Sequence, residues 1–537
     1  MRTIIVGGVA GGMSAATRLR RLDEQAEIII FERSGNVSFA NCGLPYYLGE
    51  YIPRKDLVLQ TPKSLGARFG LDVRVRHEVT SINTSAQTVS VHSLDDDVVE
   101  TISYDHLILS PGAQPVRPPI PGIELALTLR NVEDAERIYD AAASASQVII
   151  IGGGFIGLEV MENLVAKGIE VTLVEATNQI MPPMDYEMVT PVQERIKARG
   201  VNLLLGQSVV EISASGVALS TGEKLDADLV IAAIGVRPDN ALAQNAGLAL
   251  GDRGGILVDE HFRTSVPNVY AVGDAVQKVD AVDESAALIP LANQANLQGR
   301  RVADVVAGRT AFDRPVLGTA IVGVFGLQVA STGWNEKRLR AAGREARIIH
   351  THPLNHAGYF PGAKSMSLKL IVDPETDAIL GAQGVGEAGV DKRIDVIATA
   401  IAGGLTATEL AELELAYAPQ FGSAKDPVNM LGFIAENQRA GLTKAIQWYE
   451  LPEVVAAGAT ILDVRTEAEY QRSAIPGSIL VPLDELRERI TELQGGTYVV
   501  HCAVGLRGYL ATRILTQYGV ESVNLDGGIT TWAAGNA

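Results

Sequence analysis

The sequence has few cysteines, no excess of positive charge and no long apolar run. Only 2 cysteines occur in 537 residues, which excludes a disulfide framework and favours a reducing compartment. No apolar run approaches the roughly 18 residues that a spanning helix needs, and no signal peptide is recognisable, so we expect a cytoplasmic protein without a membrane partner. The 45 Lys+Arg stand against 63 Asp+Glu, a formal net charge of −18, which argues against nucleic-acid binding.

The chain is, by contrast, long and rich in apolar residues. At about 150 residues per domain, 537 residues predict three or four domains. The chain is 47% hydrophobic and only 20% charged, so large cores can be buried and disorder of the whole chain is excluded.

Two segments share one pattern: a short buried strand, a glycine-rich turn, a helix, a second strand and an acidic residue. The first has its turn at residues 7–12 and ends at Glu32; the second has its turn at residues 152–157 and ends at Glu175. Glycine turns let backbone N–H groups approach a pyrophosphate, and the helix N-terminus favours the phosphates. The pattern therefore predicts two dinucleotide sites, although Val9 stands where the middle glycine of the first turn is expected.

The acidic residue of the second segment indicates which nicotinamide cofactor is used. A carboxylate at Glu175 would accept hydrogen bonds from a ribose 2′-OH and repel a 2′-phosphate. Because residues 176–178 are Ala-Thr-Asn and offer no arginine, we expect NADH, with NADPH less favoured.

The remainder of the chain suggests three further parts. A proline-rich crossing at residues 111–121 predicts an interdomain linker, and residues 269–274 suggest a return to the first domain. From about residue 319, strand-like and helix-like runs, including a helix at residues 407–413, predict an α+β domain that ends near residue 440. A helix is expected at residues 442–449, followed by a small α/β domain from about residue 450.

The segments Ser38-Phe39-Ala40-Asn41-Cys42 and Val269-Tyr270-Ala271-Val272-Gly273-Asp274, with the two glycine turns, resemble the flavin-dependent pyridine nucleotide–disulfide oxidoreductases. This resemblance implies an FAD-binding domain (1–113 and 241–318), an NAD(H)-binding domain (114–240) and a dimerisation domain (319–440) that forms a homodimer. Carried over by position, FAD would meet Gly7, Ala10, Gly11, Gly12, Glu32, Arg33, Asn41, Cys42, Val79, Ser110, Gly112, Asp274, Pro290 and Ala292. NAD would meet Gly152, Gly154, Phe155, Ile156, Gly157, Glu175 and Gly235.

Cys42 is the first of the two cysteines, and it has no second cysteine nearby. An internal dithiol is therefore impossible at this site, and a lone thiol beside a flavin can cycle only through a mixed disulfide, a persulfide or a sulfenic acid. A helix beginning near Cys42 would favour the thiolate.

The surrounding residues separate the single-cysteine branches of the family. NADH peroxidases and water-forming NADH oxidases carry a histidine in the first glycine turn, where this chain has Ala10. The segment around Cys42 instead resembles coenzyme A-disulfide reductases, so coenzyme A is expected as substrate or carrier. That resemblance places Ser14, Arg18, Arg21, Ser38, Asn41, Arg68 and Lys425 around coenzyme A, and Tyr359 and Tyr417 as catalytic tyrosines from the partner subunit. Arg18 and Arg21 lie three apart on one helix face and can converge on a phosphorylated ligand, whereas we expect Arg20 on a solvated face.

Cys502 begins the segment Cys502-Ala503-Val504-Gly505-Leu506-Arg507 between a predicted strand and a predicted helix. Such a loop turns backbone N–H groups and the helix dipole toward the sulfur. With Asp463-Val464-Arg465 and Leu525-Asp526-Gly527-Gly528, it resembles a rhodanese domain (450–537), in which Cys502 would carry sulfane sulfur and Arg507 would add charge. No metal site is predicted.

Together these features predict an α/β protein with two Rossmann-like nucleotide-binding domains, an α+β dimerisation domain and a C-terminal rhodanese α/β domain. A fusion of a coenzyme A-disulfide reductase with a rhodanese domain fits best, and its expected activity is FAD-dependent, NADH-driven reduction of coenzyme A persulfide or polysulfide to sulfide. The alternatives are a coenzyme A-disulfide reductase with an accessory rhodanese module, an NADH oxidase or peroxidase, and a sulfur-relay or redox-sensing protein.

Overall fold

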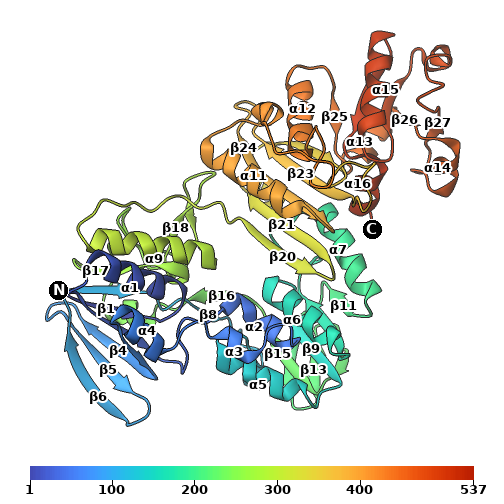
Figure 1. Ribbon diagram of the computed structural model, residues 1–537. Coiled ribbons are helices and arrows are strands. Elements are labelled where there is room, and N and C mark those ends of the chain that lie inside the picture. The colour runs from blue at the N-terminus through green and yellow to red at the C-terminus, as the bar shows by residue number, and fades with distance from the viewer. The chain divides into compact units, whose positions relative to one another are not determined.

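The computed structural model describes residues 1–537, which form two compact units (Figure 1). The first unit comprises residues 1–180 and 200–318, and the second comprises residues 181–199 and 319–537. Residues 181–199 lie inside the range predicted for NAD(H) binding, yet they pack within the second unit. None of the helices combines the length and apolarity that crossing a bilayer requires.

The first unit contains a five-stranded parallel sheet in the order β17-β7-β1-β2-β3. Its strands are β1 (Arg2–Val6), β2 (Glu27–Glu32), β3 (Asp72–Val75), β7 (His106–Leu109) and β17 (Val269–Ala271). The mainly apolar runs of β1, β2, β7 and β17 suit a sheet that is covered on both faces, whereas the edge strand β3 alternates Asp72 and Arg74 with valines. Because β17 pairs with β7, the chain returns here after residue 240, as the sequence suggests.

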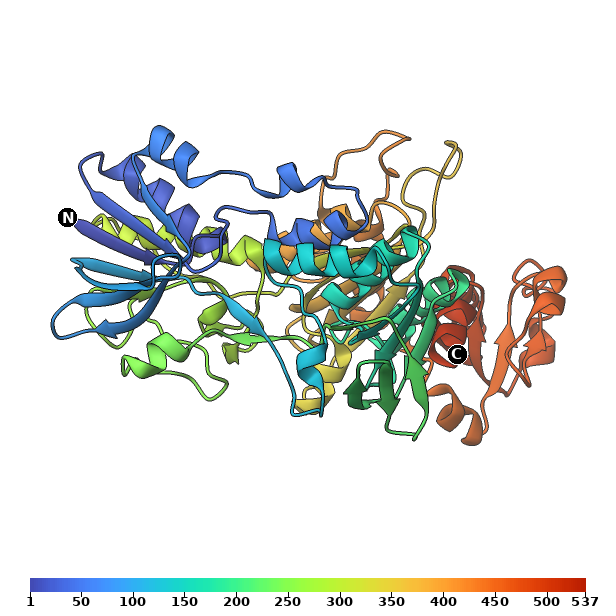
Figure 2. The ribbon, with the colours of Figure 1, turned by 90° about the horizontal axis from the view of Figure 1, so that it is seen from below.

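Two apolar cores cover the faces of this sheet. One core joins it to α1 (Ala10–Leu22), α4 (Pro62–Phe69) and α9 (Ala292–Val306). The other joins it to the antiparallel strands β4 (His77–Asn83), β5 (Thr88–Ser93) and β6 (Val98–Ser103) and to α8 (Ala241–Asn245). Figure 2 shows α1 and the hairpin strands on opposite sides of the sheet. The helices α2 (Leu44–Leu48) and α3 (Arg54–Leu57) follow Cys42.

A second parallel sheet, in the order β11-β10-β9-β15, lies in the same unit. It contains β9 (Gln147–Ile151), β10 (Glu170–Glu175), β11 (Asn202–Leu205) and β15 (Leu229–Ala232), with the helices α5 (Val132–Ala142) and α6 (Phe155–Ala166). Smaller sheets are formed by β12 (Val209–Ser213), β13 (Gly216–Leu219) and β14 (Lys224–Asp226), by β8 (Ala113–Pro115) with β16 (Val236–Pro238), and by β18 (Lys278–Val279) with β19 (Ala286–Ala287). The β8–β16 pair is antiparallel, and β8 lies within the predicted linker at residues 111–121.

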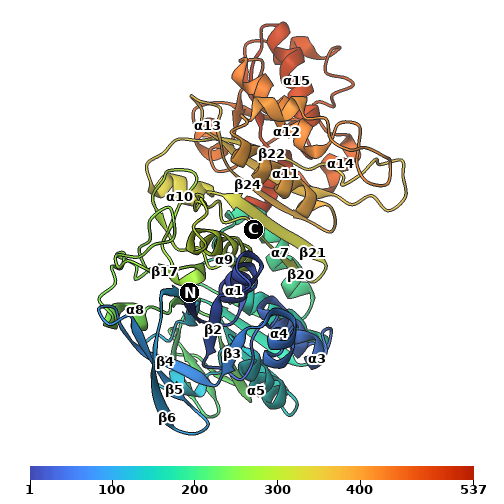
Figure 3. The ribbon, with the colours of Figure 1, turned by 60° about the vertical axis from the view of Figure 1, so that its left-hand side comes forward.

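The second unit is centred on an antiparallel sheet in the order β20-β21-β24-β23-β22. Its strands are β20 (Ala320–Val324), β21 (Leu327–Gly333), β22 (Arg347–Thr351), β23 (Met366–Val372) and β24 (Ile379–Gly386). The helices α11 (Val390–Gly403) and α12 (Pro427–Arg439) cover one face (Figure 3). The expected helix at residues 407–413 is a shorter 3-10 helix, Thr408–Glu412.

The other face of this sheet carries polar residues in register. Leu368 and Leu370 join the core beneath α11, and alternation along β23 turns Lys369 to the opposite face. Lys369 pairs with His350 on β22 and with Gln383 on β24. Here α7 (Tyr186–Ala198) packs against β24 and the C-terminal helix α16 (Gly528–Gly535), and α10 (Glu336–Ala341) adds a further carboxylate from Glu336.

The C-terminal part of the second unit has a parallel sheet in the order β25-β29-β28-β26-β27. It consists of β25 (Ala445–Ile446), β26 (Thr460–Asp463), β27 (Ile479–Leu480), β28 (Thr497–His501), β29 (Glu521–Leu525), α13 (Leu451–Ala456), α14 (Glu467–Arg472), α15 (Leu506–Gln517) and α16. The helix expected at residues 442–449 is wrong, because Ala445 and Ile446 pair with β29 as an edge strand.

Candidate active site

The two glycine turns are built alike. A Cβ at Gly12 would lie 1.9 Å from the carbonyl oxygen of Gly7, and a Cβ at Gly157 would lie 2.0 Å from that of Gly152, so only glycine permits either helix to pack this closely. Gly7 and Gly152 both have positive φ, 99° and 108°, which favours glycine.

The middle position of each turn has no such requirement. Gly154 has a φ of −82°, and a Cβ placed there would meet nothing within 4 Å. Val9, at the matching place in the first turn, has a φ of −114°. The missing glycine of the first turn is therefore compatible with the same backbone path.

The two acidic residues hold their turns in the same way. Glu32 accepts hydrogen bonds from the backbone N–H of Gly8 (2.9 Å) and of Ser34 (2.9 Å). Glu175 accepts from Gly153 (2.7 Å) and from Thr177 (2.9 Å). Each carboxylate thus lies beside the glycine turn at the end of the second strand, the place from which it can reach a ribose.

Asp274 offers a ligand a buried acceptor in the first unit. Asp274 follows β17, its Oδ1 is buried without a hydrogen-bond partner in the protein, and burial raises its pKa against the opposing influence of Lys278 and Arg130. A buried, unsatisfied carboxylate oxygen needs a donor, which ribityl or ribose hydroxyls of FAD would supply. The residues present therefore fit FAD.

Cys42 lies in a 3-10 turn, Asn41–Gly43, directly before α2, and it is exposed. The sequence suggested a favoured thiolate, but the surrounding protein acts in the opposite direction. Partial burial raises the pKa of the Cys42 thiol, and the carboxylates of Glu159 and Asp274 raise it further. A backbone hydrogen bond at Cys42 acts in the other direction but is outweighed.

Glu159, on α6, has a pKa well above that of an ordinary carboxyl group. Burial, with a contribution from Glu162, raises the pKa of Glu159 to about 7, although the hydroxyl of Tyr46 donates to it at 3.3 Å. Burial and Glu159 in turn raise the pKa of Tyr46 to about 12. Glu159 therefore changes charge near neutral pH beside the thiol.

Replacing Glu159 by glutamine should consequently change the reactivity of Cys42 in only one pH range. Above about pH 7 the wild-type carboxylate is charged and opposes the thiolate, so the variant should be alkylated faster by iodoacetamide. Below about pH 7 the carboxyl is protonated, and the two proteins should react alike. The measurement is the pH dependence of alkylation of the Cys42 peptide by mass spectrometry, with Glu170→Gln, an exposed acid at the start of β10, as control. Equal rates throughout would show that Glu159 does not influence the thiol.

Cys502 lies at the end of β28 and is only 1% exposed. The backbone N–H of Gly505 donates to its sulfur at 3.2 Å, and α15 begins at Leu506. Arg507 extends to Glu469, with hydrogen bonds of 2.8 and 2.6 Å to the two carboxylate oxygens. The predicted cradle of strand, loop and helix is present around the sulfur.

Three parts of the chain match known protein families. Residues 1–299 match the pyridine nucleotide-disulphide oxidoreductase family, residues 319–427 match its dimerisation domain, and residues 447–535 match the rhodanese-like domain. The chain belongs to the pyridine nucleotide-disulphide oxidoreductase family. It is an FAD-dependent oxidoreductase that uses NAD(P)H and carries a rhodanese-like domain, as the motifs predict, and the dimerisation domain supports a homodimer.

Three known proteins are similar to this chain over most of their length. The coenzyme A disulfide reductase of Staphylococcus haemolyticus (strain JCSC1435) is 36% identical over 440 residues, which are 81% of this chain and 99% of that protein. The crystal structure of reduced CoADR-RHD from Bacillus anthracis is 46% identical, with a TM-score of 0.98 over 99% of this chain and 98% of that one. The NAD-dependent persulfide reductase of A. fulgidus is 37% identical, with a TM-score of 0.93 over 99% of this chain and 100% of that one. The predicted resemblance to a reductase–rhodanese fusion is confirmed.

The residues predicted for coenzyme A have diverse surroundings. The hydroxyl of Ser14 donates to the carbonyl of Asn296, and Arg18 forms an ion pair with Asp304 at 2.7 Å. Arg21, Arg68, Asn41 and Lys425 are exposed, and Ser38 is half-buried with a positive φ of 48°. Only Arg18 among the predicted arginines is already neutralised, and coenzyme A contact stays a prediction for all of them.

Arg20 differs from the expected solvated side chain. It is 7% exposed, and its guanidinium donates to the carbonyls of Phe69, Gly70 and Glu24. Arg20 therefore ties α1 to the end of α4, where the fan of guanidinium donors satisfies C-terminal carbonyls.

The predicted catalytic tyrosines lie together in the second unit. The hydroxyls of Tyr359 and Tyr417 are 2.8 Å apart, and the side chains are 75% and 47% exposed. The hydrogen bond from Tyr417 raises the pKa of Tyr359. Two exposed phenols joined in this way are available to a ligand or to a partner subunit.

The remaining predicted FAD and NAD positions line the two cradles in the first unit. Arg33 forms an ion pair with Asp239 at 3.0 Å, Val79 is buried, and Gly112 and Gly235 have positive φ. Ala10 and Phe155 begin the two helices α1 and α6, and Ala292 begins α9 after Pro290. Their contact with cofactors remains a prediction.

Sequence reasoning missed several charged residues. Arg130 donates to the carbonyl of Pro111 at 2.8 Å, and burial lowers its pKa. Lys278 is 2% exposed and donates to the carbonyl of Gly273 at 2.9 Å. These residues and Glu159 have no motif of their own, and only the fold brings them to the cradles.

A buried polar network lies behind the Cys502 loop. The backbone N–H of Ile529 donates to the carbonyl of Cys502 at 2.9 Å, and a Cβ at Gly528 would lie 2.5 Å from the same oxygen. Two residues earlier, Asp526 accepts from the imidazole Nδ1 of His350 at 2.7 Å. The position of the Cys502 loop thus depends on residues 526–529, which His350 holds through Asp526.

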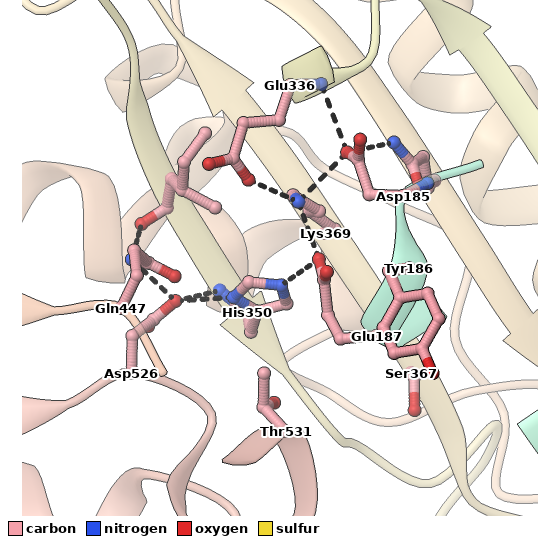
Figure 4. Close-up of polar contacts among 12 residues, drawn as sticks. Asp185, Tyr186, Glu187, Glu336, His350, Ser367, Lys369, Gln447, Asp526 and Thr531 are labelled. Carbon is pink, nitrogen blue, oxygen red and sulfur yellow. Dashed lines mark hydrogen bonds and ion pairs between the residues drawn. The ribbon is translucent and has the colours of Figure 1, made fainter. Parts of the chain in front are cut away.

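Figure 4 shows how this network continues into α7. His350 also contacts Glu187 at 3.1 Å, and Glu187 accepts from Lys369 at 2.6 Å. Although burial alone lowers the pKa of His350, its hydrogen bonds to Asp526 and Glu187 raise it to about 9. His350 is therefore held as an imidazolium between two carboxylates at neutral pH.

Three carboxylates of this network could superficially suggest a metal site. Oxygens of Asp185, Glu187 and Glu336 lie within 4.8 Å of one another. The ammonium of Lys369 contacts all three, at 2.9, 2.6 and 2.7 Å. Lys369 supplies the positive charge at the centre of the cluster.

Proposed function

We propose that this enzyme uses NADH to reduce the persulfide of coenzyme A, and polysulfide, to sulfide through Cys42, and that Cys502 delivers sulfane sulfur. The observation that carries the proposal is the arrangement of the only two cysteines. Cys42 is exposed in the unit that contains both dinucleotide cradles, and Cys502 lies in the rhodanese-like loop. Both are free thiols, which also fits the proposed cytoplasmic location.

The surroundings of Glu175 support NADH over NADPH. Its carboxylate is fixed at the end of β10 by the N–H groups of Gly153 and Thr177. A 2′-phosphate would have to approach this negative charge, while a 2′-OH could donate to it. Residues 176–178 supply no compensating arginine.

The chemistry at Cys42 needs one thiol and two electrons. The Cys42 thiolate attacks the sulfur that is bound to coenzyme A, the S–S bond breaks, and HS⁻ leaves with its electron pair. The product is a mixed disulfide between Cys42 and coenzyme A. FAD held by the first glycine turn, Glu32 and Asp274 would supply the two electrons of NADH to this disulfide, and its reduction would restore the Cys42 thiolate and free coenzyme A. In sum, the persulfide and NADH give coenzyme A, HS⁻ and NAD⁺.

The C-terminal domain favours persulfide over coenzyme A disulfide as the substrate. The staphylococcal coenzyme A disulfide reductase matches 440 residues of this chain and 99% of its own length, so the rhodanese-like residues 447–535 are an addition. A thiol that carries sulfane sulfur has a use when the reductase consumes persulfides. Coenzyme A disulfide would react at Cys42 by the same bond exchange and is the second candidate.

The proposed coenzyme A site combines residues near the N-terminus of one protomer with residues from the dimerisation domain of the partner subunit. Ser14, Arg18, Arg21, Ser38, Asn41 and Arg68 would contact coenzyme A, and Tyr359, Tyr417 and Lys425 would come from the partner subunit of a homodimer. The paired phenols of Tyr359 and Tyr417 could protonate a leaving thiolate. Because their pair is exposed, no bond within its own unit must break first.

Anaerobic turnover tests this function directly. With NADH and coenzyme A persulfide, the enzyme should consume NADH and release sulfide in equal amounts for many turnovers. Faster turnover of coenzyme A disulfide would favour the second candidate, and only a few turnovers per flavin would favour a sensing role.

Cys502→Ser should separate delivery from reduction. With polysulfide and coenzyme A supplied together, we expect at least about a tenfold loss of sulfide release, because no thiolate at position 502 accepts the sulfane sulfur and passes it to the thiol of coenzyme A. Coenzyme A persulfide, which reaches Cys42 directly, should keep its rate. Sulfide release is measured with both donors side by side, and unchanged rates with both would remove Cys502 from the pathway.

A further inference from the structure

The cation of the Cys502 loop is neutralised by a carboxylate. Arg507 is the only charged residue of the six from Cys502 to Arg507. Glu469 on α14 binds its guanidinium through both carboxylate oxygens, at 2.8 and 2.6 Å. This bidentate pair lowers the pKa of Glu469 well below its ordinary value, so the carboxylate stays charged at neutral pH.

Glu469 is fixed in place by a second set of bonds. It is the third residue of α14, and its Oε2 accepts from the N–H of Thr466 at 3.0 Å and from the Thr466 hydroxyl at 2.9 Å. Thr466 in turn accepts from the N–H of Glu469, which completes a capping box. The negative charge is therefore held beside Arg507 by the start of the helix and does not depend on the ion pair alone.

Neighbouring positive groups offer no replacement for Arg507. Arg465 is 4% exposed and is bound to Asp463 at 2.6 Å. His501, directly before Cys502, is buried, and burial lowers its pKa, so it is neutral at pH 7. The sulfur thus has the backbone N–H of Gly505 and the guanidinium of Arg507 beside it, and the charge of that guanidinium is already paired with Glu469.

The rim of the loop is apolar. Val504, Leu506 and Leu510 are 38%, 58% and 43% exposed, and Leu506 and Leu510 share one face of α15. Solvated apolar side chains favour a donor with an organic stem, because its contact removes apolar surface from water. A small hydrated dianion gains nothing from them.

We infer that Glu469 makes Cys502 selective for organic persulfides over thiosulfate, by cancelling the positive charge that a sulfonate would need. The inference rests on the proposed function, in which Cys502 receives sulfane sulfur. With an organic persulfide, the Cys502 thiolate attacks the terminal sulfur, the S–S bond breaks, and the organic thiolate leaves with its electron pair. With thiosulfate the same attack would expel sulfite, but the dianion must first approach Glu469, and like charges oppose that approach.

Sulfur loading of the full-length Cys42→Ser protein tests this selectivity without any contribution from the reductase centre. Benzyl persulfide, which has an uncharged apolar stem, and thiosulfate are supplied separately, and the rate of sulfur addition to the Cys502 peptide is followed by mass spectrometry. The wild-type loop should load at least about tenfold faster from benzyl persulfide. Glu469→Gln should raise the ratio of the thiosulfate rate to the persulfide rate at least about tenfold, because one negative charge is lost near the sulfonate.

The choice of variant separates charge from structure. Glutamine suits the third position of a capping box as glutamate does, so α14 and the loop keep their positions. Glu492→Gln removes a carboxylate from an exposed pair with Arg489 in the same domain, and the donor ratio should stay at the wild-type value.

The outcomes distinguish the inference from the proposed function. If Cys502 loads from both donors at similar rates, or if Glu469→Gln leaves the ratio unchanged, the selectivity is refuted while the delivery role stands. If neither donor loads Cys502, the delivery role itself is refuted and the selectivity with it.

Discussion

The Cys42→Ser enzyme should bind FAD, accept electrons from NADH and release almost no sulfide. Hydride transfer to the flavin needs the two cradles around the glycine turns, and these do not involve the thiol. Cleavage of the persulfide needs a sulfur nucleophile, and the chain has no second cysteine near Cys42 to replace it. We expect a loss of at least about a thousandfold in kcat/KM with coenzyme A persulfide, as for removal of other nucleophiles.

Two measurements separate this result from a folding defect. Flavin absorbance should show stoichiometric FAD in the variant, and anaerobic NADH should bleach it as in the wild type. Sulfide release is then measured with coenzyme A persulfide, with Cys502→Ser as the matched control for losing a thiol. Sulfide release by Cys42→Ser at a rate near that of the wild type would rule out the proposed mechanism.

The sequence predicted what short-range rules determine. Glycine turns, buried strands and acidic residues recur at fixed spacing, so the two parallel sheets and their cradles were foreseeable. Val9 departs from the motif, and the backbone path accommodates it, since Gly154 at the matching place also has a negative φ.

Electrostatic features depended instead on contacts between distant segments. Helix α6 brings Glu159 to Cys42, and the pKa of the thiol rises where the local sequence suggested a favoured thiolate. Arg20 looked like a solvated residue, but the end of α4 offers it buried carbonyls. Neither the raised pKa of Cys42 nor the burial of Arg20 can be predicted from the residues that neighbour them in the sequence.

The C-terminal half shows the same limit for secondary structure. Residues 445–446 form strand β25 because β29 offers an edge, although their own sequence suggested a helix. Pairing with a strand almost 80 residues later overrides local propensity. Lys369 is likewise an ordinary lysine in the sequence, and only the register of β22, β23 and β24 reveals its surroundings.

Lys369→Met should strongly destabilise the second unit. Lys369 is fully buried, and its ammonium is the cation that contacts Asp185, Glu187 and Glu336. Burial alone would lower its pKa, but these carboxylates raise it well above the usual range. Without Lys369, His350 still faces Glu187 and Arg340 still faces Glu336, but the buried carboxylates outnumber the remaining cations, and breaking a buried ion pair in this way costs about 3–5 kcal/mol. We expect the urea midpoint to fall by about 1–2 M.

Tryptophan fluorescence can report this change from the affected unit alone. All 3 tryptophans, Trp334, Trp448 and Trp532, belong to the second unit. Their fluorescence therefore reports unfolding of that unit and not of the nucleotide-binding sheets in the first unit. Lys364→Met removes an exposed lysine that pairs with Glu387 at 3.0 Å and should cost less than about 1 kcal/mol. Adding Glu336→Gln to Lys369→Met should recover part of the loss, since one buried charge disappears. A Lys369→Met midpoint equal to that of Lys364→Met would mean that the carboxylates are not compensated by Lys369, and that water or protons neutralise them instead.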